Sequence, residues 1–148
     1  MVSKVSFRAI FVGGITDIVA TDLLNIPLVM YEISKNNASN LSREQAHAKW
    51  VAAFHGDVVV YLAGMSIGLA CSIFGGYVAA YIAEHDELLN GTLSSFLCVI
   101  MGIYSIAVGH YANSRWMEAA ILFAAAPICG LAGGYLRFRQ RRPAAQQF

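Results

Sequence analysis

Four long apolar segments follow one another along the chain, and shorter polar stretches separate them. A helix needs about 20 residues to cross a hydrocarbon core about 30 Å thick, and each segment reaches this length. The pattern therefore predicts four membrane-crossing helices, at residues 7–31, 57–82, 88–111 and 116–138. We expect an all-α integral membrane four-helix bundle that forms a single transmembrane domain over residues 1–148.

The polar connections differ in length. The second and third read AEHDELLNG and YANSRW, so the helices that they join should be antiparallel neighbours. The first is longer, and within it Ser42 and Gln45 have the spacing of a capping box. Apolar residues then recur on one helical face, which predicts a short interfacial helix over residues 42–54. A plain extension of the second crossing beyond the bilayer is the alternative.

The composition agrees with a membrane protein. Hydrophobic residues make up 57% of the chain and charged residues 13%, whereas soluble domains average about 45–50% and about 25%. The expected surroundings are therefore the lipid bilayer, and a net charge of +1 gives no argument for a nucleic-acid partner. The cysteines Cys71, Cys98 and Cys129 match no close-spaced metal motif, and we interpret them as small packing residues.

Basic residues near the ends of the crossings predict the orientation, because loops rich in Lys and Arg stay in the cytoplasm. With four crossings, both termini lie on the same side of the membrane. That side holds six basic residues: Lys4, Arg8, Arg137, Arg139, Arg141 and Arg142. The opposite side holds four: Lys35, Arg43, Lys49 and Arg115. We therefore expect both termini to be cytoplasmic.

Small residues recur at helix-packing spacings in all four crossings. Lipid tails are as apolar as leucine, so membrane helices associate where small residues let their backbones approach closely. The glycines expected at helix contacts are Gly13, Gly64, Gly68, Gly75, Gly76, Gly91, Gly130 and Gly134. The contacts can lie within one bundle, between copies of the chain, or both.

The first crossing contains two aspartates. Gly13, Asp17 and Thr21 share one stripe of the helix, while Asp22 and Asn25 form a second stripe about 140° away from Asp17. An aspartate at the centre of a membrane helix costs about 2.5–3.5 kcal/mol, and no Lys or Arg lies in the middle of any crossing. We expect Asp17 to be neutral at pH 7, or held by hydroxyls, water or backbone donors. Two polar stripes suggest that more than one neighbour covers this helix.

Another group of polar residues falls near the outer ends of the crossings. It includes His55, Asp57, His110 and Glu118, whose side chains are suitable metal ligands. These residues are scattered over three segments, so we predict neither a metal site nor a cofactor. The chain also lacks the Walker loop, G-x-S-x-G and H-E-x-x-H motifs, and we do not expect an enzyme.

Residues 73–106, IFGGYVAAYIAEHDELLNGTLSSFLCVIMGIYSI, resemble a pattern in small bacterial and archaeal membrane proteins of unknown function. In that family, a GGYVAARIA-type helix end precedes a polar turn and LLHGALVGLL, and GGITDIVATDLL is similar to its G-x-x-x-D-x-x-G-S first crossing. The resemblance implies a four-helix inner-membrane protein without an assigned activity. It marks Asp17, Gly75, Gly76 and Gly91 as pattern positions. The chain departs from the pattern at Asn90, where histidine is frequent, and at Ala20, where glycine is frequent.

Two classes of function fit these features. The first is a non-enzymatic structural or accessory protein that packs with itself or with a larger membrane complex. The second is a small proton- or ion-coupled transporter or channel that uses Asp17 and Asp22. Four helices without an inverted repeat favour the first class. A water-accessible path to Asp17 and an oligomeric pore would indicate the second.

Overall fold

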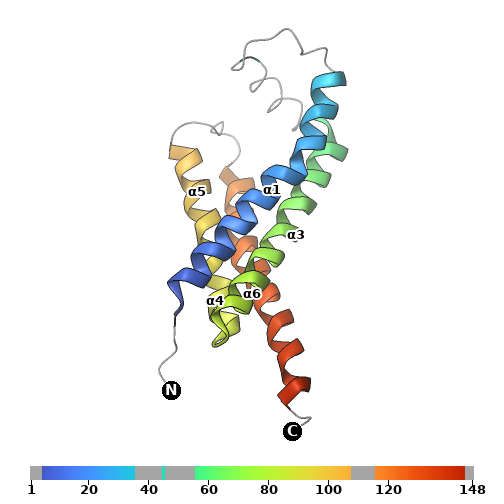
Figure 1. Ribbon diagram of the computed structural model, residues 1–148. Helices are drawn as coiled ribbons and strands as arrows, with labels where there is room; N and C mark the ends of the chain where they lie inside the picture. The colour runs from blue at the N-terminus through green and yellow to red at the C-terminus, as the bar shows by residue number, and fades with distance from the viewer. Residues whose placement is uncertain (1–4, 36–44, 46–55, 108–115, 146–148) are drawn as a thin grey trace. The chain divides into compact units, whose positions relative to one another are not determined.

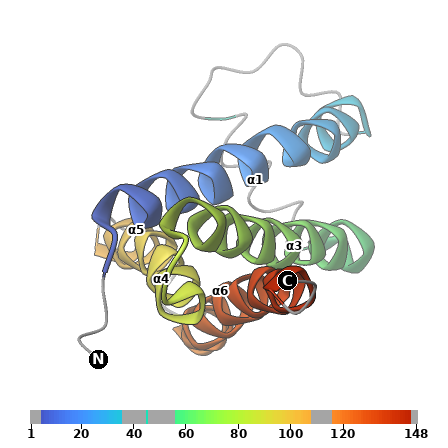
Figure 2. The same cartoon turned by 60° about the horizontal axis from the view of Figure 1, so that its bottom comes forward.

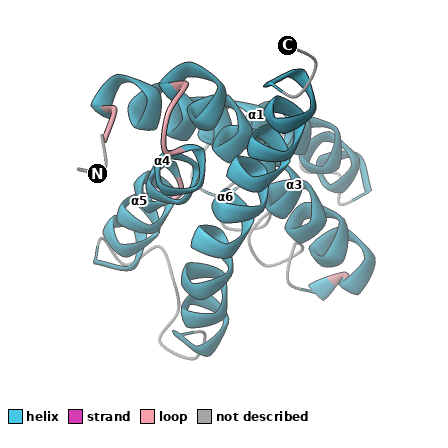
Figure 3. Ribbon diagram, turned by 90° about the horizontal axis from the view of Figure 1, so that it is seen from below, coloured by secondary structure: helices cyan, strands magenta, loops and turns pink. Residues whose placement is uncertain are grey.

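The computed structural model describes residues 5–35, 45, 56–107 and 116–145, and all regular structure in these ranges is α-helical (Figures 1 and 3). The helices are α1 (Phe7–Lys35), α3 (Val58–Ala83), α4 (Glu87–Ser94), α5 (Phe96–Ala107) and α6 (Trp116–Ala145). Four stretches are long and apolar enough to cross a membrane: Phe7–Lys35, Val58–Ala83, Glu87–Tyr104 and Ala120–Arg141. The predicted class, an all-α multi-pass membrane protein with four crossings, is therefore confirmed.

The first connection lies mostly outside the described residues. This includes the interfacial helix predicted over residues 42–54, of which the structure describes only Gln45, an exposed residue in helical conformation. That helix therefore stays a prediction.

The third crossing is divided into α4 and α5 at Ser95 instead of forming one uninterrupted helix. Hydroxyl groups just before the break bond back to the helix: Thr92 Oγ1 donates to the Leu88 carbonyl at 2.8 Å, and Ser94 Oγ to the Gly91 carbonyl at 2.8 Å. Similar bonds from Thr16 and Ser66 occur within the uninterrupted helices α1 and α3, so back-bonding alone does not explain the break. The sequence predicted the crossing but not this interruption.

The chain forms two compact units. The first comprises Met1–Val19 with Leu69–Phe148, and the second comprises Ala20–Gly68, so α1 and α3 each contribute to both. The single domain predicted over residues 1–148 remains a prediction, and the two units are described separately below.

The first unit is held together by glycine contacts between helix backbones. A Cβ built on Gly76 of α3 would lie 2.7 Å from the Cα of Gly130 in α6, and one built on Gly133 would overlap the carbonyl oxygen of Ile73. The helix α4 lies along α6 (Figure 2), and a Cβ on Gly91 would be 2.9 Å from the Cα of Gly134. Any side chain at these positions would push the helices apart.

The same kind of contact joins α1 to α3 within the first unit. A Cβ on Gly13 would lie 2.6 Å from both the Ala79 Cβ and the Gly75 carbonyl oxygen. Of the other predicted glycines, Gly64 is buried, but a Cβ on Gly68 would meet no described atom within 4 Å. Gly68 is therefore not a close helix contact in the described chain, although its spacing from Gly64 suggested one.

Small and polar side chains fill the interior, while large apolar side chains face outward. The fully buried side chains include Ala79 and Ala80, and the largest of them are Asn90, Ser94 and Ser95. Many leucine, isoleucine, phenylalanine and tyrosine side chains are exposed along the crossings. This distribution suits a bilayer, where apolar side chains lose nothing by facing lipid and close packing needs small residues.

In the second unit, Asp57 ties the end of α1 to the start of α3. Its Oδ1 accepts hydrogen bonds from the backbone N–H groups of Val59 (3.0 Å) and Val60 (3.4 Å), which caps α3. Its Oδ2 accepts a hydrogen bond from Lys35 Nζ at 2.8 Å. The bond from Lys35 and those from the two backbone N–H groups lower the pKa of Asp57.

Candidate functional site

Asp17 lies inside the first unit, where three helices meet around its carboxyl group. Its side chain is only 3% exposed. The Ser72 hydroxyl of α3 donates a hydrogen bond to Oδ2 at 2.8 Å, and the Cys98 thiol of α5 donates one to the same oxygen at 3.0 Å. Hydroxyl donors were among the groups expected to hold this acid, so the structure places Asp17 in the kind of setting that the sequence suggested.

The close approach of α1 and α3 positions this carboxyl group. A Cβ on Gly75 would lie 2.7 Å from the Asp17 Cβ, so the glycine brings the two helices together one turn from Ser72. A buried acid that accepts bonds from two other helices fixes their register, because sliding α3 would break a buried hydrogen bond and sliding α5 a partly buried one. Asp17 therefore acts as a structural tie, by which we mean a buried group whose hydrogen bonds hold α1, α3 and α5 together.

Sequence reasoning missed both donors. Cys98 was interpreted as a packing residue, and no pattern in the sequence connected Ser72 with Asp17. Neither has a spacing signal that points to Asp17, since the contacts join residues 55 and 81 positions apart. Only the helix arrangement brings them together.

The second polar stripe of α1 is in a different environment. Asp22 is exposed, and it forms no hydrogen bond or ion pair within the part of the chain that the structure describes. Asn25 Nδ2 donates to the Thr21 carbonyl at 2.8 Å, while Asn25 Oδ1 is buried and has no partner among the described residues. The expectation that more than one neighbour covers this helix therefore stays a prediction for the stripe that contains Asp22, which is exposed in the single chain.

The structure does not bring the possible metal ligands together. Asp57 is bonded to Lys35, and His55 and His110 lie outside the described residues. Glu118 falls within α6, but its side chain is not described. Among the described side chains, no group of three His, Cys, Asp or Glu residues is placed to hold a metal ion.

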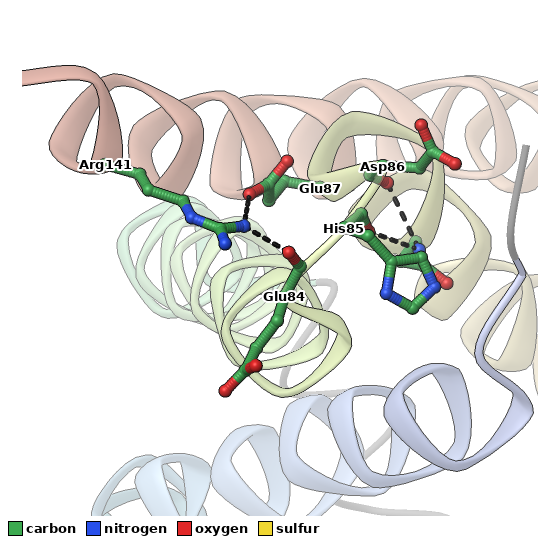
Figure 4. A network of polar contacts seen from close by, with 6 residues as sticks. Glu84, His85, Asp86, Glu87 and Arg141 are labelled. Atoms are coloured by element: carbon green, nitrogen blue, oxygen red, sulfur yellow. Dashed lines mark hydrogen bonds and ion pairs between the residues drawn. The ribbon is translucent and has the colours of Figure 1, made fainter. Parts of the chain in front are cut away.

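A second polar network surrounds the turn between α3 and α4 (Figure 4). Asn90 is fully buried, and its Nδ2 donates to the carbonyls of His85 (3.0 Å) and Asp86 (3.2 Å). Its Oδ1 accepts a bond from the backbone N–H of Ser6 at 2.9 Å, just before α1. Glu84 and Asp86 have positive φ values of 56° and 43°, which reverse the chain in this turn. The Asn90 side chain therefore supplies hydrogen-bond donors to two carbonyls of the turn, and it also connects the start of α1 to α4.

Arg141 of α6 binds the same turn from the other side. Its Nη1 donates to Glu87 Oε1 at 2.8 Å and to the Glu84 carbonyl, as Figure 4 shows. The guanidinium of Arg137 stacks over the Tyr81 ring with 4.5 Å to the centroid, which adds a second contact between α6 and α3. The start of α1 and the end of α6 therefore both lie at the end of the first unit that carries the α3–α4 turn (Figure 1).

We predict that Arg141→Ala lowers the free energy of unfolding in detergent by about 1 kcal/mol, between the values for exposed and buried ion pairs. The Arg141 side chain is 53% exposed and that of Glu87 is 10% exposed, so the loss leaves a mostly buried carboxylate without its cation. Arg139→Ala is the matched control, because Arg139 is exposed and forms no described interaction. Thermal unfolding of both variants tests this. Equal melting temperatures would show that the pair does not contribute to stability.

No family model, curated protein or solved structure matches this chain. The resemblance of residues 73–106 to small membrane proteins of unknown function therefore stays an interpretation of their motif. Within the chain itself, Asp17 and Asp22 differ most clearly in their surroundings, since Asp17 is buried and Asp22 is exposed.

Proposed function

We propose that the chain is a non-enzymatic structural or accessory component of a membrane assembly. The observation that supports this most is the difference in burial between the two aspartates of α1. Asp17 is buried and hydrogen-bonded, while Asp22 is exposed. The first arrangement holds the chain's own helices together. The second leaves an acid on the outer surface of a membrane helix, where a neighbouring protein can cover it.

Ion transport, the other class considered, has less support. A carrier that used both aspartates would need them to share one water-accessible path. Asp17 is 3% exposed, and one of its oxygens already accepts two hydrogen bonds from neighbouring helices. Asp22 lies on a different side of α1 and is exposed. The two groups are therefore in separate environments.

The mass of the purified complex tests the assembly. We expect the full chain, extracted from its own membranes in mild detergent, to migrate in a particle whose protein mass exceeds that of one 16.0 kDa chain. Native mass spectrometry measures this mass directly. Recovery of single chains only, both in detergent and after cross-linking in the membrane, would contradict the proposal.

We further propose that the chain lies in the bacterial inner membrane with both termini in the cytoplasm. Ser6 bonds to Asn90 and Arg141 bonds to Glu87, both near the start of α4, which supports placing both ends on one side. The basic residues at these ends favour the cytoplasm. The orientation also places the first connection, which includes Asn37, on the outside.

Labelling with a membrane-impermeant thiol reagent tests the orientation. The background would be Cys71→Ala, Cys98→Ser and Cys129→Ala, since serine at residue 98 keeps a donor for Asp17. In intact cells, Asn37→Cys should be labelled and a cysteine added after Phe148 should not. The reverse pattern would invert the topology.

A further inference from the structure

One face of α1 consists of exposed apolar side chains interrupted by a single acid. Val19, Ile26 and Met30 are 48%, 52% and 62% exposed. Together with the exposed Ile15 and Asp22, they follow steps of three and four residues and share a face about 80° wide. We call this set, Ile15, Val19, Asp22, Ile26 and Met30, the Asp22 face.

Asp22 lies close to the middle of the crossing. At a rise of about 1.5 Å per residue, it is about 22 Å from Phe7 and about 20 Å from Lys35, the two ends of α1. A hydrocarbon core about 30 Å thick that is centred on this helix puts the carboxyl group near its midplane. Neither a lipid headgroup nor bulk water reaches that depth, so the face is poorly suited to lipid alone.

We propose that the Asp22 face binds a transmembrane helix of a different membrane protein that carries one Lys or Arg at the same depth. This inference rests on the proposed function and names the partner's chemistry. A carboxylate within a bilayer is stabilised by a cation that donates hydrogen bonds to it. Val19 and Ile26, one turn to either side, would pack against the partner and exclude lipid from the ion pair.

A second copy of the chain does not offer this chemistry. The basic residues in the described crossings lie at helix ends: Arg8 and Lys35 in α1, and Arg137, Arg139 and Arg141 in α6. None is near the middle of a crossing. Two copies that met through this face would oppose one carboxyl group to another. Charge complementarity therefore favours a partner of different sequence.

Binding of designed peptides to the full chain in lipid vesicles tests the proposal. One peptide is an alanine–leucine transmembrane helix with a single central lysine, and its control has a central leucine instead. With fluorescence energy transfer as the readout, we expect the lysine peptide to bind at least about tenfold more tightly, a factor that a single ion pair can supply. We expect the preference to disappear in Asp22→Asn and when the lysine is moved seven residues toward the peptide's end.

Leu24→Asn is the matched control variant, because Leu24 is 55% exposed but lies on the opposite side of α1 from Asp22. It should keep the preference for lysine. Equal binding of the two peptides by the parent chain, or a preference that survives Asp22→Asn, would overturn the proposal. Sedimentation showing a dimer of the chain that Asp22→Asn abolishes would also overturn it, because a second copy would then occupy the face. Failure of the peptide test would not contradict the proposed membrane assembly, since the mass of the native particle is measured without any peptide.

Discussion

Replacing Gly133 by alanine is expected to lower the free energy of unfolding in detergent by about 2–3 kcal/mol, a large effect for one methyl group. A Cβ at this position would overlap the Ile73 carbonyl oxygen and lie 2.6 Å from the Tyr77 backbone nitrogen. Both neighbours are backbone atoms, so no side-chain rotation relieves the overlap. The helices α3 and α6 must therefore separate, and the dispersion contacts along their interface weaken.

Gly68→Ala provides the matched control on α3. A Cβ at Gly68 would meet no described atom within 4 Å, and alanine is favoured over glycine in a helix by about 1 kcal/mol. We therefore expect Gly68→Ala to melt at or above the temperature of the parent chain. Gly76→Ala should behave like Gly133→Ala, because its Cβ would lie 2.5 Å from the Gly130 carbonyl oxygen. If Gly133→Ala and Gly76→Ala both melt like the parent, the close backbone packing described here is wrong.

Asp17→Leu is the second substitution for which we expect a large loss, about 3 kcal/mol or more. Each buried donor left without an acceptor costs about 1–3 kcal/mol, and both the Ser72 hydroxyl and the Cys98 thiol would lose Oδ2. The branched leucine would also crowd Gly75, whose position is already close to the Asp17 Cβ. Thermal unfolding in detergent measures the loss.

Two further variants separate the hydrogen bonds from the shape of the side chain. Asp17→Asn keeps an oxygen that can accept both bonds, so it should stay within about 1 kcal/mol of the parent. Asp22→Leu removes the other aspartate of α1, which is exposed and has no described partner, so it should not reduce stability. Equal losses for Asp17→Leu and Asp22→Leu would show that burial of Asp17 is not what stabilises the fold.

Hydrophobic length predicted the crossings well because it is a local property of the sequence. The first crossing was expected at residues 7–31 and α1 spans Phe7–Lys35, while the second was expected at 57–82 and α3 spans Val58–Ala83. The break at Ser95 was missed because the apolar length of a segment does not reveal an interruption within it.

Contacts between helices were harder to predict than the helices themselves. Spacings of four residues pointed to Gly130 and Gly134, but the backbone of α3 also approaches Gly133, which that pattern omits. The spacing also included Gly68, although a Cβ added there would meet no described neighbour within 4 Å. Helical periodicity shows which residues share a face, but it does not show which partner that face meets or where the helices cross.

For the polar sites too, the sequence revealed local properties but not contacts between helices. The sequence marked Asp17 and Asp22 as unusual because an acid in a membrane helix is costly, and this needs no knowledge of the fold. It could not tell which of them is buried, because that depends on where α3 and α5 lie. The long-range bonds around the α3–α4 turn were missed for the same reason. Ser6 meets Asn90, and Arg141 meets Glu87, only when the start of α1 and the end of α6 lie beside this turn.

The most direct test of the account is ion flux through the full chain in proteoliposomes, compared between the parent and Asp17→Asn. If Asp17 is a structural tie, proton, sodium and potassium flux should equal that of protein-free vesicles for both proteins. Their thermal unfolding, measured on the same preparations, should also be closely similar. Flux through the parent chain that Asp17→Asn abolishes while the fold is retained would contradict the account and identify Asp17 as a transport residue.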